Sequence, residues 1–300
     1  MIKTSIISEK EYERLDLFLC EKFQISRNYS QRLIQKGRIK DKVNPDRILK
    51  ASTPVKANDY FAVRFPTAKN LTEATPEPVD FDVIYSDECV IIVNKPSGLV
   101  VHPAPDHWHG TLVNGLLYKF PDMQEFPNKL RPGIVQRLDI STSGLMVIAR
   151  TQEVSNAIQK MFLTRSIKKT YLALAQGTLK KPEGILSGPI DRDPNNFLRR
   201  AVIEGGKRSL TGYKVLQSRN NFSLIECSLL TGRTHQIRVH LSAYGHPIVG
   251  DELYGSKIEA GRVMLHSWKL EFPHPKTGEI LKFRQAIPEE FRQKCFECLH

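Results

Sequence analysis

An aspartate that follows an apolar run is the first residue of this sequence whose setting suits chemistry. In the segment GIVQRLDISTSGLMVIAR, residues 133–150, apolar residues lead to Asp139, and a Ser-Thr-Ser-Gly turn and a second apolar run follow it. Arg137 precedes Asp139 by two residues, and backbone N–H groups of such a turn can hold a carboxylate. That carboxylate could act as a nucleophile or a base. The same composition is common in Asx-turns, where the aspartate only caps the loop, so this segment alone leaves both interpretations open.

A second polar segment, residues 229–251, reads LLTGRTHQIRVHLSAYGHPIVGD. It predicts a short helix over 235–244 with Thr234 as the N-cap and Gly245 as the stop. Arginines and histidines crowd its start, and a guanidinium offers a planar fork of donors that clamps a phosphate or a carboxylate. A metal site is disfavoured, because His235 and His240 lie about 500° apart around a helix and no acidic residue stands between them. We therefore expect no metal here.

Other enzyme classes find less support in these two segments. None of the five cysteines lies inside them, and no GxSxG nucleophile elbow occurs. A magnesium nuclease would need several converging carboxylates, and a glycosidase or N-glycosylase usually pairs its first carboxylate with a second acid or base that the sequence does not reveal. No GxGxxG or Walker motif is present, so we expect no cofactor.

Composition indicates a polyanionic partner. The 300 residues include 44 Lys and Arg against 32 Asp and Glu, a net charge of +12. Residues 1–70 hold 15 of the cations and 8 of the acids, so the excess is concentrated in the first quarter of the chain. No apolar stretch is long enough for a membrane span, and few, scattered cysteines argue against disulfides. We expect a cytoplasmic protein with free thiols and no membrane contact.

The first quarter is predicted to form a small α/β domain with a basic face. One helix is predicted over 14–20 and a second in the run SRNYSQRLIQKGRIK, with Ser26 as its cap and Gly37 as its stop, and a strand over 60–65. This order, RLD, then SR…Q…I…G.I, then a strand after K.ND, resembles the αL RNA-binding module of a small-subunit ribosomal protein and of several rRNA-modifying enzymes. The alternative is an ordinary solvated basic face. The cations expected to contact RNA are Arg27, Arg32, Lys36, Arg38 and Lys40.

A proline-rich linker at 66–80 predicts the boundary between a domain over 1–75 and a catalytic domain over 76–300. The second domain mixes strands with helices without strict βαβ alternation. The pattern predicts an α+β fold with a mixed, largely antiparallel sheet and flanking helices. The expected strands are 83–85, 90–94, 145–149, 171–175, 215–216 and 223–229, and the expected helices are 111–118, 152–164 and 235–244.

Four motifs in this order resemble the RluA family of pseudouridine synthases, and in particular its bacterial RluD-type members. They are NKPSGLVVHP at 94–103, QRLDISTSG at 136–144, KKTYLAL at 168–174 and TGRTHQIRVHLSAYGHPIVGD at 231–251. The family usually has His where this chain has Gln136. The resemblance implies that Asp139 is the nucleophile and Arg137 fills the space of the flipped uridine. It also implies that Tyr171 stacks on the target base and that Arg238 forms the ion pair that keeps Asp139 ionised.

The resemblance further implies a substrate and a reaction. The target is large-subunit (23S) ribosomal RNA in the precursor of the 50S particle, and a monomer is expected to isomerise its uridines by base flipping. Attack at C1′ and proton removal at C2′ both remain open as the role of the carboxylate. The alternative function is a catalytically silent RNA-binding ribosome-assembly factor of the same fold.

Overall fold

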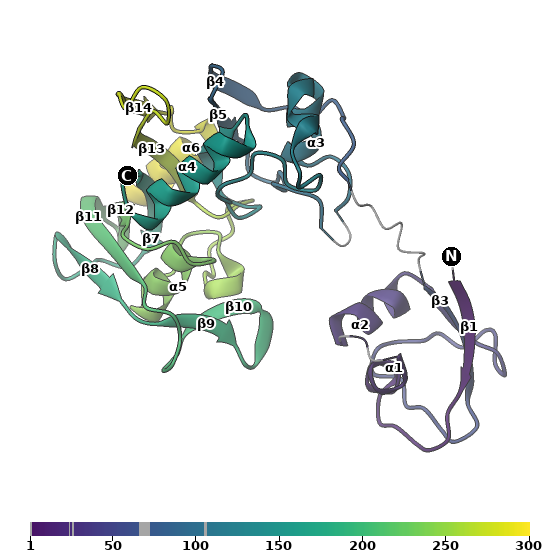
Figure 1. The fold of residues 1–300 in the computed structure, drawn as a ribbon. Helices are drawn as coiled ribbons and strands as arrows, with labels where there is room; N and C mark the ends of the chain where they lie inside the picture. Colours follow the sequence, from purple (N-terminus) through teal and green to yellow (C-terminus); the bar gives the residue numbers. More distant parts are fainter. Residues whose placement is uncertain (1, 24, 26, 66–72, 105–106) are drawn as a thin grey trace. The chain divides into compact units, whose positions relative to one another are not determined.

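The chain forms two compact units, Met1–Leu71 and Thr72–His300, in a computed structural model (Figure 1). The structure describes residues 2–23, 25, 27–65, 73–104 and 107–300. The predicted linker begins in the stretch 66–72, outside the described residues. None of the helices in the described part of the chain combines the length and the apolarity needed to cross a membrane.

The N-terminal unit packs two helices on a small antiparallel sheet with the order β1-β3-β2. The strands are β1 (Ile2–Ile7), β2 (Ile39–Asp41) and β3 (Tyr60–Phe65), and the helices are α1 (Leu15–Phe23) and α2 (Arg27–Gln35). Apolar residues of both helices form the core with β3, among them Phe18, Leu33 and Phe61. Gly37 follows α2 with φ +61°, as its predicted role as the stop requires, while the predicted cap Ser26 lies outside the described residues.

The larger unit is built on a nine-stranded sheet with the order β4-β5-β6-β13-β7-β12-β11-β8, and β14 pairs with β13. All neighbours are antiparallel except β6 and β13, which are parallel. The predicted α+β class with a mixed, largely antiparallel sheet is confirmed. The strands are β4 (Asp82–Ser86), β5 (Val90–Lys95), β6 (Ser143–Ala149), β7 (Lys168–Gln176), β8 (Glu183–Ser187), β11 (Leu210–Arg219), β12 (Phe222–Leu229), β13 (Leu265–Pro273) and β14 (Ile280–Arg284).

Helices and a separate two-stranded ribbon flank this sheet (Figure 1). Helix α4 (Gln152–Leu163) contacts β6, and α6 (Glu289–Leu299) contacts β11 and β12. Helix α5 (Gln236–Ala243) lies against β8, β11 and the ribbon of β9 (Ile190–Asp193) and β10 (Asn196–Val202). Helix α3 (Leu112–Lys119) begins at a capping box formed by Thr111 and Asn114. Single 3-10 turns occur at η1 (Pro121–Glu125) and η2 (Glu252–Tyr254).

The start of α5 differs from the prediction. Thr234 is not the N-cap: the cap position belongs to His235, which makes no side-chain capping bond and has φ +58° and ψ +18°. This left-handed conformation is uncommon for a residue other than glycine. The turn before it is held instead by the Gln236 side chain, whose carbonyl accepts the Arg233 N–H at 3.0 Å. The helix therefore begins at Gln236, with a histidine at its entrance.

Candidate active site

A cleft of about 890 Å³ in the larger unit collects all four motif segments. Residues 135–142 line it from the loop before β6, and residues 229–238 from the loop that enters α5. The end of α4 and the start of β7 add a third wall, and residues 100–104 a fourth. All four residues predicted for the catalytic unit, Arg137, Asp139, Tyr171 and Arg238, line this one cleft.

Asp139 directs its carboxylate at α5 rather than into its own turn. Its backbone carbonyl, not its side chain, accepts the Thr142 N–H at 3.0 Å. Its Oδ2 accepts a hydrogen bond from Arg238 Nη1, also at 3.0 Å, and its side chain is 22% exposed. The Asx-turn interpretation is therefore wrong, because the carboxylate does not cap the loop.

The loop that carries Asp139 is held by the preceding motif. Lys95 is fully buried at the end of β5, and its Nζ donates to the carbonyls of Pro96, Leu99 and Ile140 at 2.8, 3.0 and 3.3 Å. The Ser97 hydroxyl donates to the carbonyl of Ser141 at 2.9 Å. The NKPSG segment thus fixes the two residues that follow Asp139.

Arg238 bridges two carboxylates. It is 7% exposed at its side chain, and its Nε and Nη2 donate to Asp251 at 2.7 and 2.9 Å while Nη1 reaches Asp139. Burial acts against the charged guanidinium, but Asp251 and Asp139 hold the pKa of Arg238 above its ordinary value. Asp251 ends the same motif as Arg238 but was not among the predicted site residues.

Tyr171 is almost completely buried on β7, at the wall of the cleft. Burial, with a smaller contribution from Asp139, raises the pKa of its phenol. The side chain therefore presents a neutral aromatic ring to whatever enters the cleft.

Four cationic side chains line the cleft without a carboxylate partner within the described part of the chain. They are Arg137, Arg165, Lys169 and Arg233. Burial lowers the pKa of Lys169 to about 8, so a nearby anion would favour its charged form. This arrangement suits a phosphate backbone, which supplies the missing negative charge.

Three residues that line the cleft each have a buried polar side-chain atom with no hydrogen-bond partner among the described residues. The atoms are Nδ1 of His102, Nε2 of Gln136 and Oγ1 of Thr142. Burial, and then Arg131 and Arg137, lower the pKa of His102 to about 4, so its imidazole is neutral at pH 7. An unpaired buried donor or acceptor costs about 1–3 kcal/mol unless a ligand completes it. These three side chains therefore place unsatisfied polar groups in the wall of the cleft.

The two histidines considered as metal ligands face different partners. His240 hydrogen-bonds through Nδ1 with Thr211 and through Nε2 with the Gly188 carbonyl. His235 hydrogen-bonds through Nδ1 with the Tyr254 hydroxyl at 2.8 Å.

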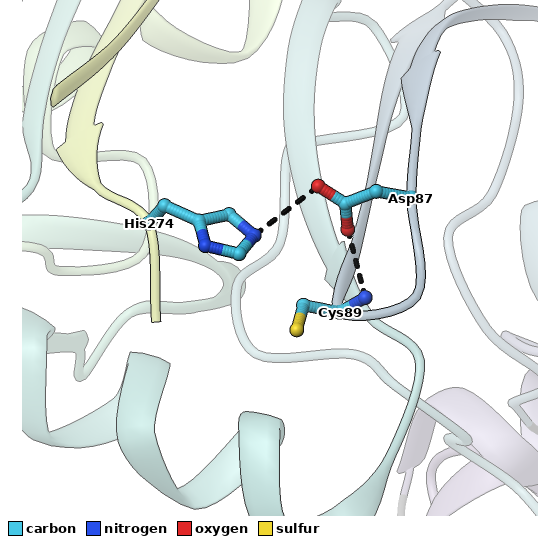
Figure 2. A group of neighbouring side chains, drawn as sticks. All are labelled: Asp87, Cys89 and His274. Carbon is cyan, nitrogen blue, oxygen red and sulfur yellow. Dashed lines mark hydrogen bonds and ion pairs between the residues drawn. The ribbon is translucent and has the colours of Figure 1, made fainter. Parts of the chain in front are cut away.

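A second group with ligand-type side chains lies away from the cleft, where the β4–β5 turn meets the end of β13 (Figure 2). Its members are Asp87, Cys89 and His274. The His274 Nδ1 accepts the Thr277 N–H at 3.1 Å, so the proton of a neutral imidazole resides on Nε2, which donates to Asp87 at 3.1 Å. Although burial acts to raise it, hydrogen bonds from Tyr85 and the backbone hold the pKa of Asp87 below its ordinary value. We interpret the group as a hydrogen-bonded link between the β4–β5 turn and the end of β13. A metal would have to bind Nε2 of His274, which already carries a proton.

On the N-terminal unit, Arg27, Lys36 and Lys40 are exposed and Arg38 is half-buried, while the side chain of Arg32 lies outside the described residues. The buried Asp16 orients part of this surface. It accepts hydrogen bonds from Arg14, from Arg27 Nε at 3.0 Å and from Gln31 at 2.6 Å. Burial acts to raise the pKa of Asp16, but these donors lower it well below its ordinary value.

An arginine-bound carboxylate in a cationic cleft, in a chain with a basic N-terminal unit, is the arrangement expected of an enzyme that acts on a polyanion such as RNA. Comparison with known proteins gives the family. The model for RNA pseudouridylate synthase matches residues 89–243, and the model for the S4 domain matches residues 13–59. The chain belongs to the RNA pseudouridylate synthase family and carries an N-terminal S4 domain, as its resemblance to RluD-type members of the RluA family predicted. It is an isomerase that converts uridine in RNA to pseudouridine.

Individual relatives agree with this assignment. The chain is 36% identical over 288 residues to the uncharacterized RNA pseudouridine synthase YlyB of Bacillus subtilis, covering 95% of this chain and 94% of the relative. It is 44% identical over 239 residues to the ribosomal large subunit pseudouridine synthase D of Neisseria meningitidis, a match that spans 75% of this chain and 63% of that protein. Among solved structures, human RNA pseudouridylate synthase domain containing 1 is similar with a TM-score of 0.57 and 29% identity, covering 70% of this chain and 84% of that one.

Proposed function

We propose that this enzyme isomerises specific uridines of bacterial 23S ribosomal RNA, in the precursor of the 50S particle, with Asp139 as the catalytic carboxylate. The observation that carries the proposal is the ion pair of Asp139 with Arg238 at the base of the cationic cleft. The large-subunit target rests on the relatives named for that activity and on the basic S4 domain. We further propose that the protein works in the cytoplasm as a monomer.

The reaction requires the target to leave the helical stack, because the bond between C1′ of the ribose and N1 of uracil is inaccessible in paired RNA. In this proposal the exposed Arg137 fills the space that the flipped nucleotide leaves, and the neutral ring of Tyr171 stacks on the extruded base. The unpaired cations along the cleft hold the flanking phosphates.

Asp139 then has one of two roles. As a nucleophile, it forms a bond to C1′ while the C1′–N1 bond breaks and its electron pair stays on uracil. The uracil turns and attacks C1′ through C5, and the bond between Asp139 and C1′ breaks, which restores the carboxylate. As a base, it removes the C2′ proton so that uracil leaves by elimination. In both routes the net result is that C5 loses a proton and N1 gains one, so no cofactor or hydrolytic water is consumed.

The experiment that tests the proposal combines Asp139→Asn with mapping of the product. The variant keeps size and fold but removes the charge, and we expect turnover to fall about a thousandfold, or about 4 kcal/mol of transition-state stabilisation. Tritium release from C5-labelled uridine in RNA measures this, and Asp122→Asn, which is half-exposed and pairs with Arg150, should match the wild type. Turnover of Asp139→Asn within tenfold of the wild type would contradict the catalytic role. Carbodiimide mapping of rRNA from a deletion strain should reveal missing pseudouridines in 23S rRNA, and an unchanged 23S pattern would contradict the target.

A further inference from the structure

His235 lies next to Asp139, near the carboxylate oxygen that Arg238 does not bind. Arg238 binds Oδ2, whereas His235 Nε2 lies 3.8 Å from Oδ1. The imidazole is 18% exposed at its side chain, and it enters the cleft from the left-handed residue that precedes α5. A left-handed backbone outside glycine costs about 1–3 kcal/mol and often marks a functional position.

The Tyr254 hydroxyl lies within hydrogen-bond distance of the second imidazole nitrogen of His235. Its oxygen accepts the backbone N–H of Arg200 at 2.8 Å. Its own proton can be donated to His235 Nδ1, which lies 2.8 Å away. A neutral His235 that accepts at Nδ1 carries its proton on Nε2, and that N–H faces Asp139.

The tyrosine is itself well fixed. Its ring is 3% exposed and meets the His235 ring edge-on, at 5.6 Å between centroids and 88° between planes. The hydroxyl of Ser242 on α5 donates to the Tyr254 backbone carbonyl at 2.7 Å. Burial lowers the pKa of His235 against the opposing effect of Asp139, which favours the neutral imidazole.

We propose that His235 is a positioning residue for Asp139, with Tyr254 fixing its tautomer so that Nε2–H holds Oδ1 in the plane required for reaction. The proposal rests on the catalytic role of Asp139 stated above. The present 3.8 Å separation exceeds a hydrogen bond, and such catalytic contacts often tighten only when substrate is bound. A neutral donor orients the carboxylate, whereas an imidazolium would pair with it and reduce its reactivity.

Two substitutions separate this role from a purely structural one. In His235→Gln the side-chain amide nitrogen reaches the place of Nε2, whereas in His235→Asn it reaches only the place of Nδ1. Asparagine is the better residue for the left-handed backbone. We expect His235→Gln to keep kcat within about tenfold and His235→Asn to lose more than about a hundredfold, with KM little changed in both. A larger loss of kcat in His235→Gln than in His235→Asn would mean that His235 serves the left-handed backbone turn, and it would overturn the proposal. Equal losses of kcat in the two variants would overturn it as well.

The tautomer of His235 can be measured in the free protein, without a catalytic assay. ¹⁵N NMR of the histidine side chains should find the His235 proton on Nε2 in the wild type and a mixture of tautomers in Tyr254→Phe. A proton on Nδ1 in the wild type overturns the proposal whatever the turnover. If the wild type isomerised no RNA while its tautomer was as expected, the proposed function would fail and the arrangement around His235 would stand.

Discussion

Arg238 is bound more completely by Asp251 than by Asp139: two of its nitrogens donate to Asp251, at 2.7 and 2.9 Å, and one to Asp139, at 3.0 Å. Asp251 is 1% exposed, so it anchors the guanidinium from the protein side through Nε and Nη2 and leaves Nη1 for Asp139. The carboxylate of Asp139 is thus oriented by Arg238, which the carboxylate of Asp251 holds in place.

Removing the charge of Asp251 should therefore affect stability and turnover together. Asp251→Asn leaves a buried arginine with one charged partner, and we expect a loss of about 3 kcal/mol in the free energy of unfolding. Turnover should also fall, because Arg238 is then free to shift toward Asp139. Denaturant unfolding and tritium release measure the two effects. Asp191→Asn, which removes a half-exposed partner 3.9 Å from Arg200, should cost less than about 1 kcal/mol, and an equal cost in both variants would contradict the prediction.

Gln136 should contribute to RNA binding rather than to folding, because its buried amide nitrogen has no partner within the described residues. We expect Gln136→Leu to leave the free energy of unfolding unchanged or higher, and to raise KM about tenfold through loss of a hydrogen bond to RNA. Gln136→His, which restores the residue usual in the family, should retain activity. Destabilisation by Gln136→Leu with an unchanged KM would instead mean that the amide supports the fold.

Acid should destabilise the larger unit between pH 6.5 and pH 4. Burial, with Arg131 and Arg137, lowers the pKa of His102 to about 4 from the 6.5 of a free imidazole, and burial does the same for His266. Within this window the unfolded chain binds protons that the folded chain does not, so the free energy of unfolding decreases as the pH falls.

His102→Gln should make that pH dependence shallower, as measured by urea unfolding at pH 6.5 and 4.5 without RNA. The exposed His107 supplies the control, since His107→Gln should leave the slope as in the wild type. An equal slope in His102→Gln would show that His102 is not the group responsible.

The S4 domain should add affinity through phosphate contacts. The double variant Lys36→Ala, Lys40→Ala removes two exposed cations from the basic surface. Each lost phosphate contact should reduce the log–log salt slope of RNA binding by about 0.7 on single strands or 0.9 on duplex. The double variant Lys50→Ala, Lys56→Ala removes the same charge from elsewhere in the unit and should change the slope less. Equal slopes for the two double variants would favour an ordinary solvated surface.

The group of Asp87, Cys89 and His274 should not bind a metal ion. The Asp87 carboxylate already accepts hydrogen bonds from Tyr85 and His274. Adding Co²⁺ should therefore produce no cobalt–thiolate absorption band, and the spectra of the wild type and of Cys89→Ser should be the same. A cobalt-dependent band lost in Cys89→Ser, together with a metal-dependent rise in Tm, would overturn this interpretation.

The sequence pattern predicted those helices that begin at hydrogen bonds between neighbouring residues. Thr111 and Thr151 accept N–H groups at the starts of α3 and α4, and the observed helices follow the predicted ones within a residue or two. Thr234 failed as a cap because the Gln236 side chain holds this turn: it accepts the Arg233 N–H and donates to the carbonyl of Leu210, 26 residues away. A contact between residues far apart in the chain cannot be recognised from the local pattern of apolar and polar residues.

The same distinction applies to the site. Asp139 and Arg238 emerged from motifs with recognisable composition, and the structure brings them within hydrogen-bond distance. Asp251, Tyr254 and Lys95 did not emerge, because each acts through partners that only the folded sheet brings near. The ribbon of β9 and β10 and strands β8, β13 and β14 were not predicted either. Their alternation of buried and exposed residues is short or irregular.

The parallel pairing of β6 with β13 bears on when the site is assembled during synthesis. Asp139 lies four residues before β6, its arginine follows 99 residues later, and β13, the parallel partner of β6, begins only at Leu265. While the ribosome is still making the chain, the S4 domain and the β4–β5 hairpin can fold from local contacts, but the carboxylate has no counter-ion until Arg238 is made. We expect the docking of β13 between β6 and β7 to be the late step of folding. A nascent chain could then bind RNA before it was able to modify it.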